Sequence, residues 1–378
     1  MIVILFIIVG IYVGVLMWFL TGLQANSRIS SVSRTNDPFV SVVIAARDEE
    51  NNLELLLTSL DKQTYPQNKY EVIVANDRST DNTEQILEAI VKHHYNFQSV
   101  RILKTPPGWA PKQWALNCAI EASKGDIILF TDADCRPTDT WICAMAAEFS
   151  DPSVGFVSAP APLSQGHGWI DDIFLLDSLV QDGFSAGGMS RGIALSCTGR
   201  NMGIRRSVFS GVNGYDGIQS FISGDDDLLL QKVASLTDFK VSFHLRSDAL
   251  VYSSPPKDIH TFFRQRFRFA SKGLSYYHLN TTTEMRMILP LLYITNIIAL
   301  FSMIIVIKET SLIALMLWGF KSIGDGIYSH WIFQNLKIRW SIKAFWVLTI
   351  FHPMYIAIFG ALGPFLNIRW KENDKPLE

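Results

Sequence analysis

The sequence predicts a doubly wound α/β domain with a mainly parallel sheet, flanked by transmembrane helices on both sides. Three observations support this fold class. Short apolar and β-branched runs alternate with helical patterns between residues 37 and 256. Long apolar segments lie before and after that region. Acidic residues follow two of the predicted strands, at the edge where sheets of this kind bind ligands.

The first apolar segment, Ile2 to Leu20, contains no charged residue. As a helix it would cross about 28 Å, close to the hydrocarbon thickness of a bilayer. A cleaved signal peptide is the alternative, but the segment has no basic start and no small-x-small cleavage site near Ala25. We therefore expect an uncleaved anchor over residues 1–22. Arg28 and Arg34 follow it and favour an external N-terminus with a cytoplasmic middle region.

The middle region, residues 37–256, has the composition of a soluble domain. Its apolar runs predict strands, and the segments between them have helical periodicity. Regular alternation of strands and helices favours a parallel sheet with helices on both faces. The predicted strands are 40–45, 70–75, 100–103 and 127–131, and the predicted helices are 49–60, a segment around 86–90, and 114–122.

The last third of the chain, residues 286–368, is expected to span the membrane about three times. Lys321 and Asp325 lie inside the second span at i, i+4 spacing, either to neutralise each other or to contact a polar lipid headgroup. Three spans would leave the C-terminus outside, whereas residues 369–371 resemble an inside flank, so the last span could be re-entrant. The predicted spans are 287–307, 311–333 and 344–366, with kinks expected at Pro290, His352–Pro353 and Pro364.

Residues 257–280, which precede these spans, predict an amphipathic helix at the membrane surface. Phe263 and Phe267 fall on one face, and Arg264 and Arg268 on another. The aromatic face would rest at the acyl boundary, and the cations would face lipid headgroups.

Composition excludes some classes of function. The net charge of −2 gives no basic surface for nucleic acid. The four cysteines form no CxxC pair and no zinc spacing, so we expect reduced thiols in a cytosolic domain.

Asp132 and Asp134 follow the predicted strand 127–131 and are separated by one residue. Alternate side chains of an extended segment point the same way, so both carboxylates would leave the strand end on one side. A divalent cation would relieve their repulsion and keep positions open for phosphate oxygens. A solvated acidic turn is the alternative.

Asp225, Asp226 and Asp227 precede an apolar helix, 228–236. Aspartates at a helix N-terminus cap free amides and suit the helix dipole. Three in a row exceed what capping requires, and clustered carboxylates can raise the pKa of one member, which suits a general base.

Six short motifs occur in order along the chain, and together they resemble a membrane-attached family 2 glycosyltransferase with the GT-A fold. The resemblance covers residues 38–275. It implies inverting, metal-dependent transfer of a sugar from a nucleotide-sugar donor, with Mn²⁺ or Mg²⁺ as the cofactor. The motifs are Val-Val-Ile-Ala-Ala-Arg-Asp-Glu-Glu (42–50), Ala-Asn-Asp-Arg-Ser-Thr-Asp (75–81), Pro-Gly-Trp-Ala-Pro-Lys (107–112), Thr-Asp-Ala-Asp (131–134), Ser-Gly-Asp-Asp-Asp-Leu (223–228) and Gln-Arg-Phe-Arg-Phe (265–269).

The resemblance implies roles for individual residues in donor binding. Asp77 would accept a hydrogen bond from a uracil ring, Asp134 would bind the metal, and Asp132 would lie near the ribose or sugar. Lys112 would reach the phosphates or the sugar, unless it is only a solvated lysine at a helix start. Further donor contacts are expected from Ala45, Arg47 and Glu49 in the first motif, and from Gly199 and Asn201 in the loop 198–203.

Asp226 matches the family's general base, which takes the acceptor proton during in-line attack on the anomeric carbon; the aspartate before it is the alternative. Gln265, Arg266 and Arg268 match the family's Gln-x-x-Arg-Trp motif and are expected to contact the donor, but Phe269 replaces the tryptophan. That replacement argues against a tight acceptor platform, and therefore against processive synthesis.

The expected activity is transfer of a sugar, from a donor expected to be UDP-linked, to a hydroxyl of a lipid-linked or membrane acceptor. The chain would be a multi-pass protein of the cell (inner) membrane with its catalytic domain in the cytoplasm. Two alternatives stay open: a processive polysaccharide synthase, and a catalytically inactive membrane scaffold or sugar-nucleotide sensor.

Overall fold

The computed structural model describes residues 2–27, 37–164, 168–256 and 258–365. The chain forms two compact units, which we describe separately. Of the described residues, the sheet unit comprises 37–162 and 196–254, and the helical unit comprises 2–27, 163–164, 168–195, 255–256 and 258–365. The predicted basic flanks, Arg28 and Arg34 on one side and residues 369–371 on the other, lie outside the described residues.

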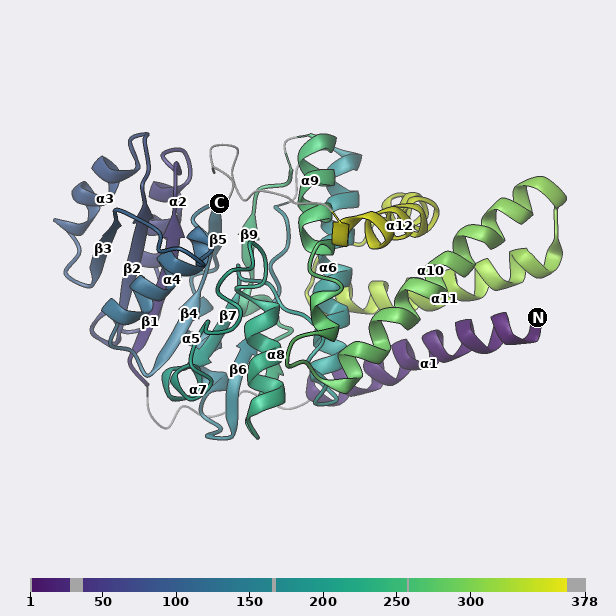
Figure 1. The fold of residues 1–378 in the computed structure, drawn as a ribbon, viewed down its shortest axis with the longest axis horizontal. Coiled ribbons are helices and arrows are strands. Elements are labelled where there is room, and N and C mark those ends of the chain that lie inside the picture. Colours follow the sequence, from purple (N-terminus) through teal and green to yellow (C-terminus); the bar gives the residue numbers. More distant parts are fainter. Residues whose placement is uncertain (1, 28–36, 165–167, 257, 366–378) are drawn as a thin grey trace. The chain divides into compact units, whose positions relative to one another are not determined.

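The sheet unit is built around a seven-stranded sheet with the strand order β3-β2-β1-β4-β7-β6-β8 (Figure 1). The first four strands in this order run parallel to one another, β7 is antiparallel to both of its neighbours, and β8 is parallel to β6. The predicted mainly parallel sheet is therefore confirmed. The strands are β1 (Val40–Ala46), β2 (Tyr70–Asp77), β3 (Phe97–Ile102), β4 (Ile127–Phe130), β6 (Val154–Ser158), β7 (Met202–Arg205) and β8 (Lys240–Phe243); β5 (Cys135–Pro137) and β9 (Val251–Ser253) form a separate two-stranded sheet.

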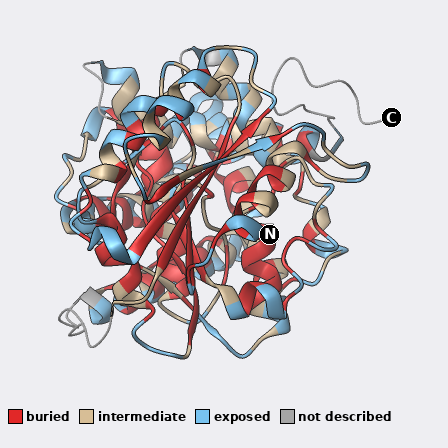
Figure 2. Cartoon of the chain, turned by 90° about the vertical axis from the view of Figure 1, so that its left-hand side faces the viewer, coloured by how far each residue is buried: buried red, intermediate tan, exposed pale blue. Residues whose placement is uncertain are grey.

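Helices cover both faces of the large sheet. Val42 and Ile44 of β1 pack in one core cluster with the leucines of α2 and with α5, whereas α4 packs against β1 and β2 outside that cluster. Figure 2 shows the strands as buried. The helices of this unit are α2 (Leu53–Asp61), α3 (Thr83–Val91), α4 (Pro111–Ala122), α5 (Trp141–Glu148), α7 (Arg206–Gly211) and α8 (Asp227–Leu236), with short 3-10 turns at Gln67–Lys69 and Ser247–Ala249.

Several predicted boundaries were wrong, among them the start of α4, which is Pro111 and not residue 114. Helix α2 begins at Leu53, not at residue 49, because residues 49–52 form a polar turn at the carboxyl edge of the sheet. Strand β3 begins at Phe97 and ends before Leu103, which is exposed. Leu53, Leu56, Leu57 and Leu60 of α2 are all buried, and each contributes about 1.5–3 kcal/mol relative to an exposed position.

Among the described residues, the helical unit has three helices long and apolar enough to cross a membrane: one near the N-terminus, Ile2–Asn26, and two in the last third, Thr283–Glu309 and Ile342–Leu362. The second predicted C-terminal span, 311–333, is a helix, α11, but it is not among them, because Lys321, Asp325 and several small residues lower its hydropathy. The helices of this unit are α1 (Ile2–Ser27), α6 (Trp169–Met189), α9 (Ile259–Ala270), α10 (Thr283–Glu309), α11 (Leu312–Asn335) and α12 (Ile342–Leu362), with 3-10 turns at Ser275–Tyr277 and Gly363–Phe365.

The segment 163–195 departs from the predicted domain boundaries. The sequence placed it inside a continuous domain over residues 37–256, but its helix α6 packs against α1, α11 and α12 of the helical unit. Asp177 of α6 explains part of this packing, since its buried carboxylate accepts hydrogen bonds from Arg266 of α9 and from the hydroxyl of Tyr355 on α12.

The charges predicted inside the apolar helices neutralise each other, which was one of the two predicted alternatives. Lys321 Nζ lies 2.7 Å from Asp325 Oδ2, and the Tyr12 hydroxyl donates a 2.6 Å hydrogen bond to the other carboxylate oxygen. Burial of these charges is tolerated because each has a partner.

The predicted interfacial helix is shorter than expected, and part of its surface packs against another helix of the protein. Helix α9 ends at Ala270, and Lys272, which lies inside the predicted helix 257–280, is buried. Phe263 and Phe267 both pack edge-on against Phe359 of α12, with ring centroids 5.4 and 4.4 Å apart. Part of the aromatic face therefore joins α9 to α12 and does not face lipid.

Candidate functional site

The polar residues of the predicted site gather at the carboxyl edge of the parallel strands. Strands β2, β1 and β4 are adjacent in the sheet and end at this edge. Asp77 ends β2, residues 47–50 follow β1, and Asp132 and Asp134 follow β4. Neighbouring strands are about 4.8 Å apart, so the edge from β2 to β4 spans about 10 Å.

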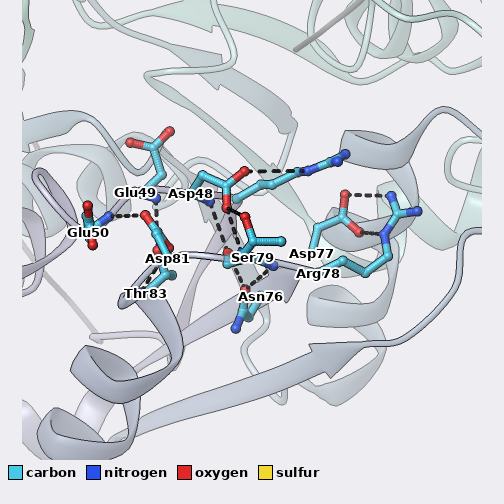
Figure 3. A network of polar contacts seen from close by, with 11 residues as sticks. Asp48, Glu49, Glu50, Asn76, Asp77, Arg78, Ser79, Asp81 and Thr83 are labelled. Atoms are coloured by element: carbon cyan, nitrogen blue, oxygen red, sulfur yellow. Dashed lines mark hydrogen bonds and ion pairs between the residues drawn. The ribbon is translucent and has the colours of Figure 1, made fainter. Parts of the chain in front are cut away.

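The loops after β1 and β2 form what we call the polar loop pair, residues 47–50 and 76–83 (Figure 3). Backbone N–H groups of each loop donate to side-chain oxygens of the other. Asp48 and Arg78 adopt the left-handed region, with φ of 52° and 56°, so the tight turns carry some strain that the cross-bonds offset. The bonds are Asp48 N to Ser79 Oγ (3.0 Å), Thr80 N to Asp48 Oδ1 (2.7 Å), Glu49 N to Thr83 Oγ1 (2.9 Å) and Glu50 N to Asp81 Oδ2 (3.0 Å).

Asp77 is fully buried, and its carboxylate is covered by the guanidinium of Arg78 (Figure 3). Arg78 donates from Nε to Oδ1 at 2.8 Å and from its terminal nitrogen to Oδ2 at 3.1 Å. A nucleobase that reached Asp77 would have to share this carboxylate with Arg78 or displace the guanidinium. The uracil contact of Asp77 stays a prediction.

The other residues predicted in the first motif lie beside this loop pair. Ala45 is buried in β1, and Arg47 Nε lies 4.0 Å from an oxygen of Asp48. Glu49 accepts a 2.9 Å hydrogen bond from Asn52, and its negative charge raises the pKa of Asp134. Through the charge of Glu49, the first motif therefore acts both on the polar loop pair and on the acidic residues after β4.

Lys112 joins the two acidic motifs of the site. Its ammonium lies 2.9 Å from Asp132 Oδ1 and 2.9 Å from Asp225 Oδ2. Burial lowers the pKa of Lys112, but the two carboxylates raise it by more, so the lysine stays charged. The alternative of a solvated lysine was wrong. Contact with the donor phosphates stays a prediction, and in the structure the ammonium bridges the end of β4 to the loop before α8.

The three consecutive aspartates have different surroundings. Asp225 is buried in the ion pair with Lys112, whereas Asp226 is half-exposed at the N-cap of α8. Asp226 accepts hydrogen bonds from Asp227 N at 2.7 Å and from Gly199 N at 3.0 Å. A carboxylate has about four acceptor positions, so capping the helix does not by itself prevent this group from accepting a proton.

Gly199 sits where no side chain fits easily. A Cβ at this position would lie 3.1 Å from Asp225 Oδ2 and 3.6 Å from Lys112 Nζ. The loop 198–201 therefore approaches the bridged carboxylates with its backbone, as the predicted donor-sugar loop requires.

Asn201 does not support its predicted role. It is fully buried, accepts from the indole of Trp141 at 2.8 Å, and donates to the carbonyls of Pro160 and Ala249 at 2.8 Å each. Its amide holds three segments of the sheet unit together and has no surface toward a ligand. The predicted contact between Asn201 and the donor stays a prediction.

The remaining predicted donor residues, Gln265, Arg266 and Arg268, lie on α9 in the helical unit. Arg266 is bound to Asp177, and Gln265 is exposed. Their donor contacts stay predictions.

The charges around Asp134 suit a divalent cation. Although Asp134 reaches the surface, loss of water around its carboxyl is the first cause that raises its pKa; the charges of Asp132 and Glu49 add to the effect, while Arg200 lowers it. Within the described residues, no group of three or more His, Cys, Asp or Glu side chains is arranged to hold a metal ion. A cation bound by Asp134 would therefore take its other ligands from water or from phosphate, as hard divalent cations do in nucleotide sites.

Sequence reasoning missed Arg200, because its neighbours come from distant segments. It donates to Thr198 Oγ1 at 3.2 Å and to Ser253 Oγ, 53 residues further along the chain, at 2.5 Å. The surplus of positive residues near this loop was a possible signal, but spacing alone does not distinguish Arg200 from Arg205 or Arg206.

Two family models match the chain: Glycosyl transferase family 2 over residues 41–212, and Glycosyl transferase family group 2 over residues 127–362, more than half of the chain. One similar curated protein is Glycosyltransferase AglE of Haloferax volcanii, with 31% identity over 131 residues, 35% of this chain and 42% of that protein. Another is Beta-monoglucosyldiacylglycerol synthase of a Nostoc species, with 32% identity over 120 residues, 32% of this chain and 25% of that protein. The matched part spans less than half the length of either relative.

Among solved structures, the chain is similar to a mannosyltransferase from Pyrobaculum calidifontis in complex with GDP-Man and Mn²⁺. The TM-score is 0.61 at 16% identity, with 98% of this chain and 99% of that chain covered. At this identity the similarity concerns the fold alone, and it confirms the GT-A fold predicted from the sequence.

Proposed function

Because this chain belongs to the family 2 glycosyltransferases, we propose that it transfers a sugar from a nucleoside-diphosphate sugar to a hydroxyl of a membrane acceptor. The observation that carries this proposal is the ion-paired assembly of Asp132, Lys112 and Asp225 at the carboxyl edge of the sheet. This assembly connects the acidic pair after β4 to the aspartates at the start of α8. The described part of the chain also has three apolar helices of membrane-spanning length.

In this proposal the donor lies along the edge of the sheet. The nucleoside would occupy the β2 end, near Asp77 and Arg78, and the diphosphate would lie about 10 Å further on, near Asp132 and Asp134. A UDP-linked donor is our first choice, as the family resemblance implies. A GDP-linked donor is the second, since the structurally similar mannosyltransferase was solved with GDP-Man.

A divalent cation, Mn²⁺ or Mg²⁺, would be held by Asp134. When bound it would neutralise negative charge on the diphosphate as the sugar departs. The negative surroundings of Asp134 support this assignment.

Asp226 would act as the general base. It is the more exposed of the two candidate aspartates, whereas Asp225 is committed to Lys112. The acceptor oxygen would attack the anomeric carbon while Asp226 takes its proton, and the electron pair of the carbon–phosphate oxygen bond would pass to the nucleoside diphosphate. In-line displacement of this kind inverts the configuration of the anomeric carbon.

The acceptor is proposed to be a lipid or a lipid-linked molecule at the cytoplasmic face of the cell membrane. Three apolar helices support membrane residence, and one similar relative is named for the synthesis of a glucosyldiacylglycerol. Phe269, which stands where the family has tryptophan, is exposed on α9 and supports a non-processive enzyme over a polysaccharide synthase.

The test supplies membranes containing the protein with radiolabelled UDP- and GDP-sugars and then separates the products. Label in the organic-extractable fraction, absent with Asp226→Asn, is the expected result. Label confined to long water-soluble polymer would indicate the synthase instead. Donor binding without transfer or hydrolysis would indicate the sugar-nucleotide sensor.

A further inference from the structure

We propose that Arg200 binds the diphosphate of the donor, a contact that none of the six sequence motifs assigns to it. This inference rests on the proposed function and adds a donor-binding residue to the same site.

The β5–β9 pairing places Arg200 beside the acidic pair. Its guanidinium donates to Ser253 Oγ at 2.5 Å, and Ser253 pairs directly with Cys135 in the two-stranded sheet. Cys135 immediately follows Asp134. Two segments more than 100 residues apart in sequence therefore bring the guanidinium to the strand that begins directly after Asp134, the residue proposed to bind the metal.

The other cations of the edge are already neutralised. Lys112 is paired with two carboxylates, Arg78 is paired with Asp77, and Arg47 lies at ion-pair distance from Asp48. The partners of Arg200 are two hydroxyls, those of Thr198 and Ser253. In the part of the chain that the structure describes, no carboxylate lies within ion-pair distance of Arg200, so its charge is available to an incoming anion.

The chemistry of the guanidinium suits a diphosphate. Arginine has five N–H donors in a planar fork that matches phosphate oxygens, and the two hydroxyl contacts leave donors unused. Neutral partners orient the side chain without cancelling its charge, so little reorganisation is needed when the anion arrives. As the sugar departs, negative charge grows on the diphosphate, and a cation fixed beside it stabilises that charge.

The test compares binding of nucleoside diphosphates with binding of the corresponding nucleosides. Full-length protein in detergent is titrated with UDP, GDP, uridine and guanosine in the presence of Mn²⁺ by calorimetry. Arg200→Gln should lower the affinity for the diphosphate that the wild type binds by about 10- to 100-fold, the usual value of a charge-assisted contact. Binding of the matching nucleoside should stay unchanged, which also shows that the variant is folded.

Arg136→Gln is the matched control. Arg136 lies two residues after Asp134 but is exposed on β5, so the variant loses the same charge near the same motif. It should bind the diphosphate as the wild type does. Equal loss in both variants would indicate a general electrostatic effect, and unchanged diphosphate binding in Arg200→Gln would also overturn the inference.

Parallel loss of nucleoside and diphosphate binding in Arg200→Gln would assign Arg200 to loop structure and overturn its phosphate role. Failure of the wild type to bind either diphosphate would instead overturn the proposed function, and this inference with it.

Discussion

Two regions of the same sheet edge differ in how their polar groups are satisfied. In the polar loop pair, residues 47–50 and 76–83, carboxylates and hydroxyls accept hydrogen bonds from backbone N–H groups, as Figure 3 shows. At the β4 end, Asp132, Asp134, Asp225 and Asp226 gather around two cations, Lys112 and Arg200. Four carboxylates against two cations leave a formal charge of −2 there.

This difference separates groups that stabilise the fold from groups kept for a ligand. Carboxylates bound to backbone N–H groups hold two loops in place and satisfy amides that would otherwise be unpaired. A surplus of nearby carboxylates costs stability and is typical of sites whose ligand supplies the missing positive charge. Changes in the polar loop pair should therefore affect folding first, and changes at the β4 end should affect activity first.

The largest expected effect is on turnover at the β4 end. Asp226→Asn should lower the rate of sugar transfer by about 10²–10⁴-fold, because the amide cannot accept the acceptor's proton. Nucleotide affinity should stay close to that of the wild type. Initial rates and calorimetric titrations of the same preparation measure the two quantities.

Asp238→Asn is the control for that substitution, since Asp238 is exposed beyond the other end of α8. A loss in Asp226→Asn no greater than in the control would assign Asp226 to helix capping. A larger loss in Asp225→Asn would move the base to Asp225.

Lys112→Met tests whether the bridge that joins the two acidic motifs also stabilises the fold. Removing one partner of a buried ion pair typically costs about 3–5 kcal/mol, because the carboxylates left behind are uncompensated. Hydrogen exchange of the β1 and β4 amides in the full-length protein would measure the loss. Lys104→Met, at an exposed lysine, should leave exchange unchanged, and the addition of Asp132→Asn and Asp225→Asn should restore part of the loss.

A third region, around His244, gives the protein's stability a pH dependence of its own. This effect must be separated from any titration of the acidic residues at the sheet edge. The imidazole of His244 contacts Glu148 at 2.8 Å and Asp248 at 2.7 Å. Burial lowers the pKa of His244, but these two carboxylates raise it, to a net value of about 9.

Because this folded-state pKa exceeds the ordinary value of 6.5, the stability contribution of His244 is complete below pH 6.5 and is lost as the pH rises through about 9. The loss should reach up to about 3 kcal/mol. Thermal unfolding from pH 6 to 9.5 should show it in the wild type and not in His244→Gln. A pH dependence that persists in the variant would show that the acidic site, and not His244, titrates in this window.

The smallest expected effect belongs to the polar loop pair. Asp48→Ala removes the acceptor of the Thr80 amide and places a less tolerant residue at a positive φ, which should cost about 1–2 kcal/mol. Asp48→Asn keeps an oxygen acceptor and tolerates the left-handed region, so it should cost much less. Hydrogen exchange of the β2 amides distinguishes the two. Equal loss in both variants would mean that the charge, and not the hydrogen bond, holds the loop.

The strands next to the site could be predicted closely because they are buried on both faces. Parallel strands of this kind form continuous apolar runs, and β1 and β4 differ from their predicted ends by one residue each. The polar residues that follow these runs had to lie at the carboxyl edge, whatever the details of packing. Asp77, Asp132 and Asp134 were identified for that reason.

Side-chain partners could not be predicted in the same way. Lys112 and Asp225 are 113 residues apart in the chain, and no local pattern shows that they meet. Asn201 resembled a ligand contact because of its motif, but the packing of Trp141, Pro160 and Ala249 around it uses its whole amide.

The sequence by itself determined the order of the first four large-sheet strands and the helices between them, the acidic motifs and the apolar segments, because these follow from periodicity and composition within short windows. The tertiary structure alone decided which carboxylates are paired, that α6 joins the helical unit, and that β9 brings Ser253 and Arg200 to the end of β4. These depend on contacts between segments far apart in the chain, and the energy of a buried charge is set by those contacts and not by its neighbours in sequence.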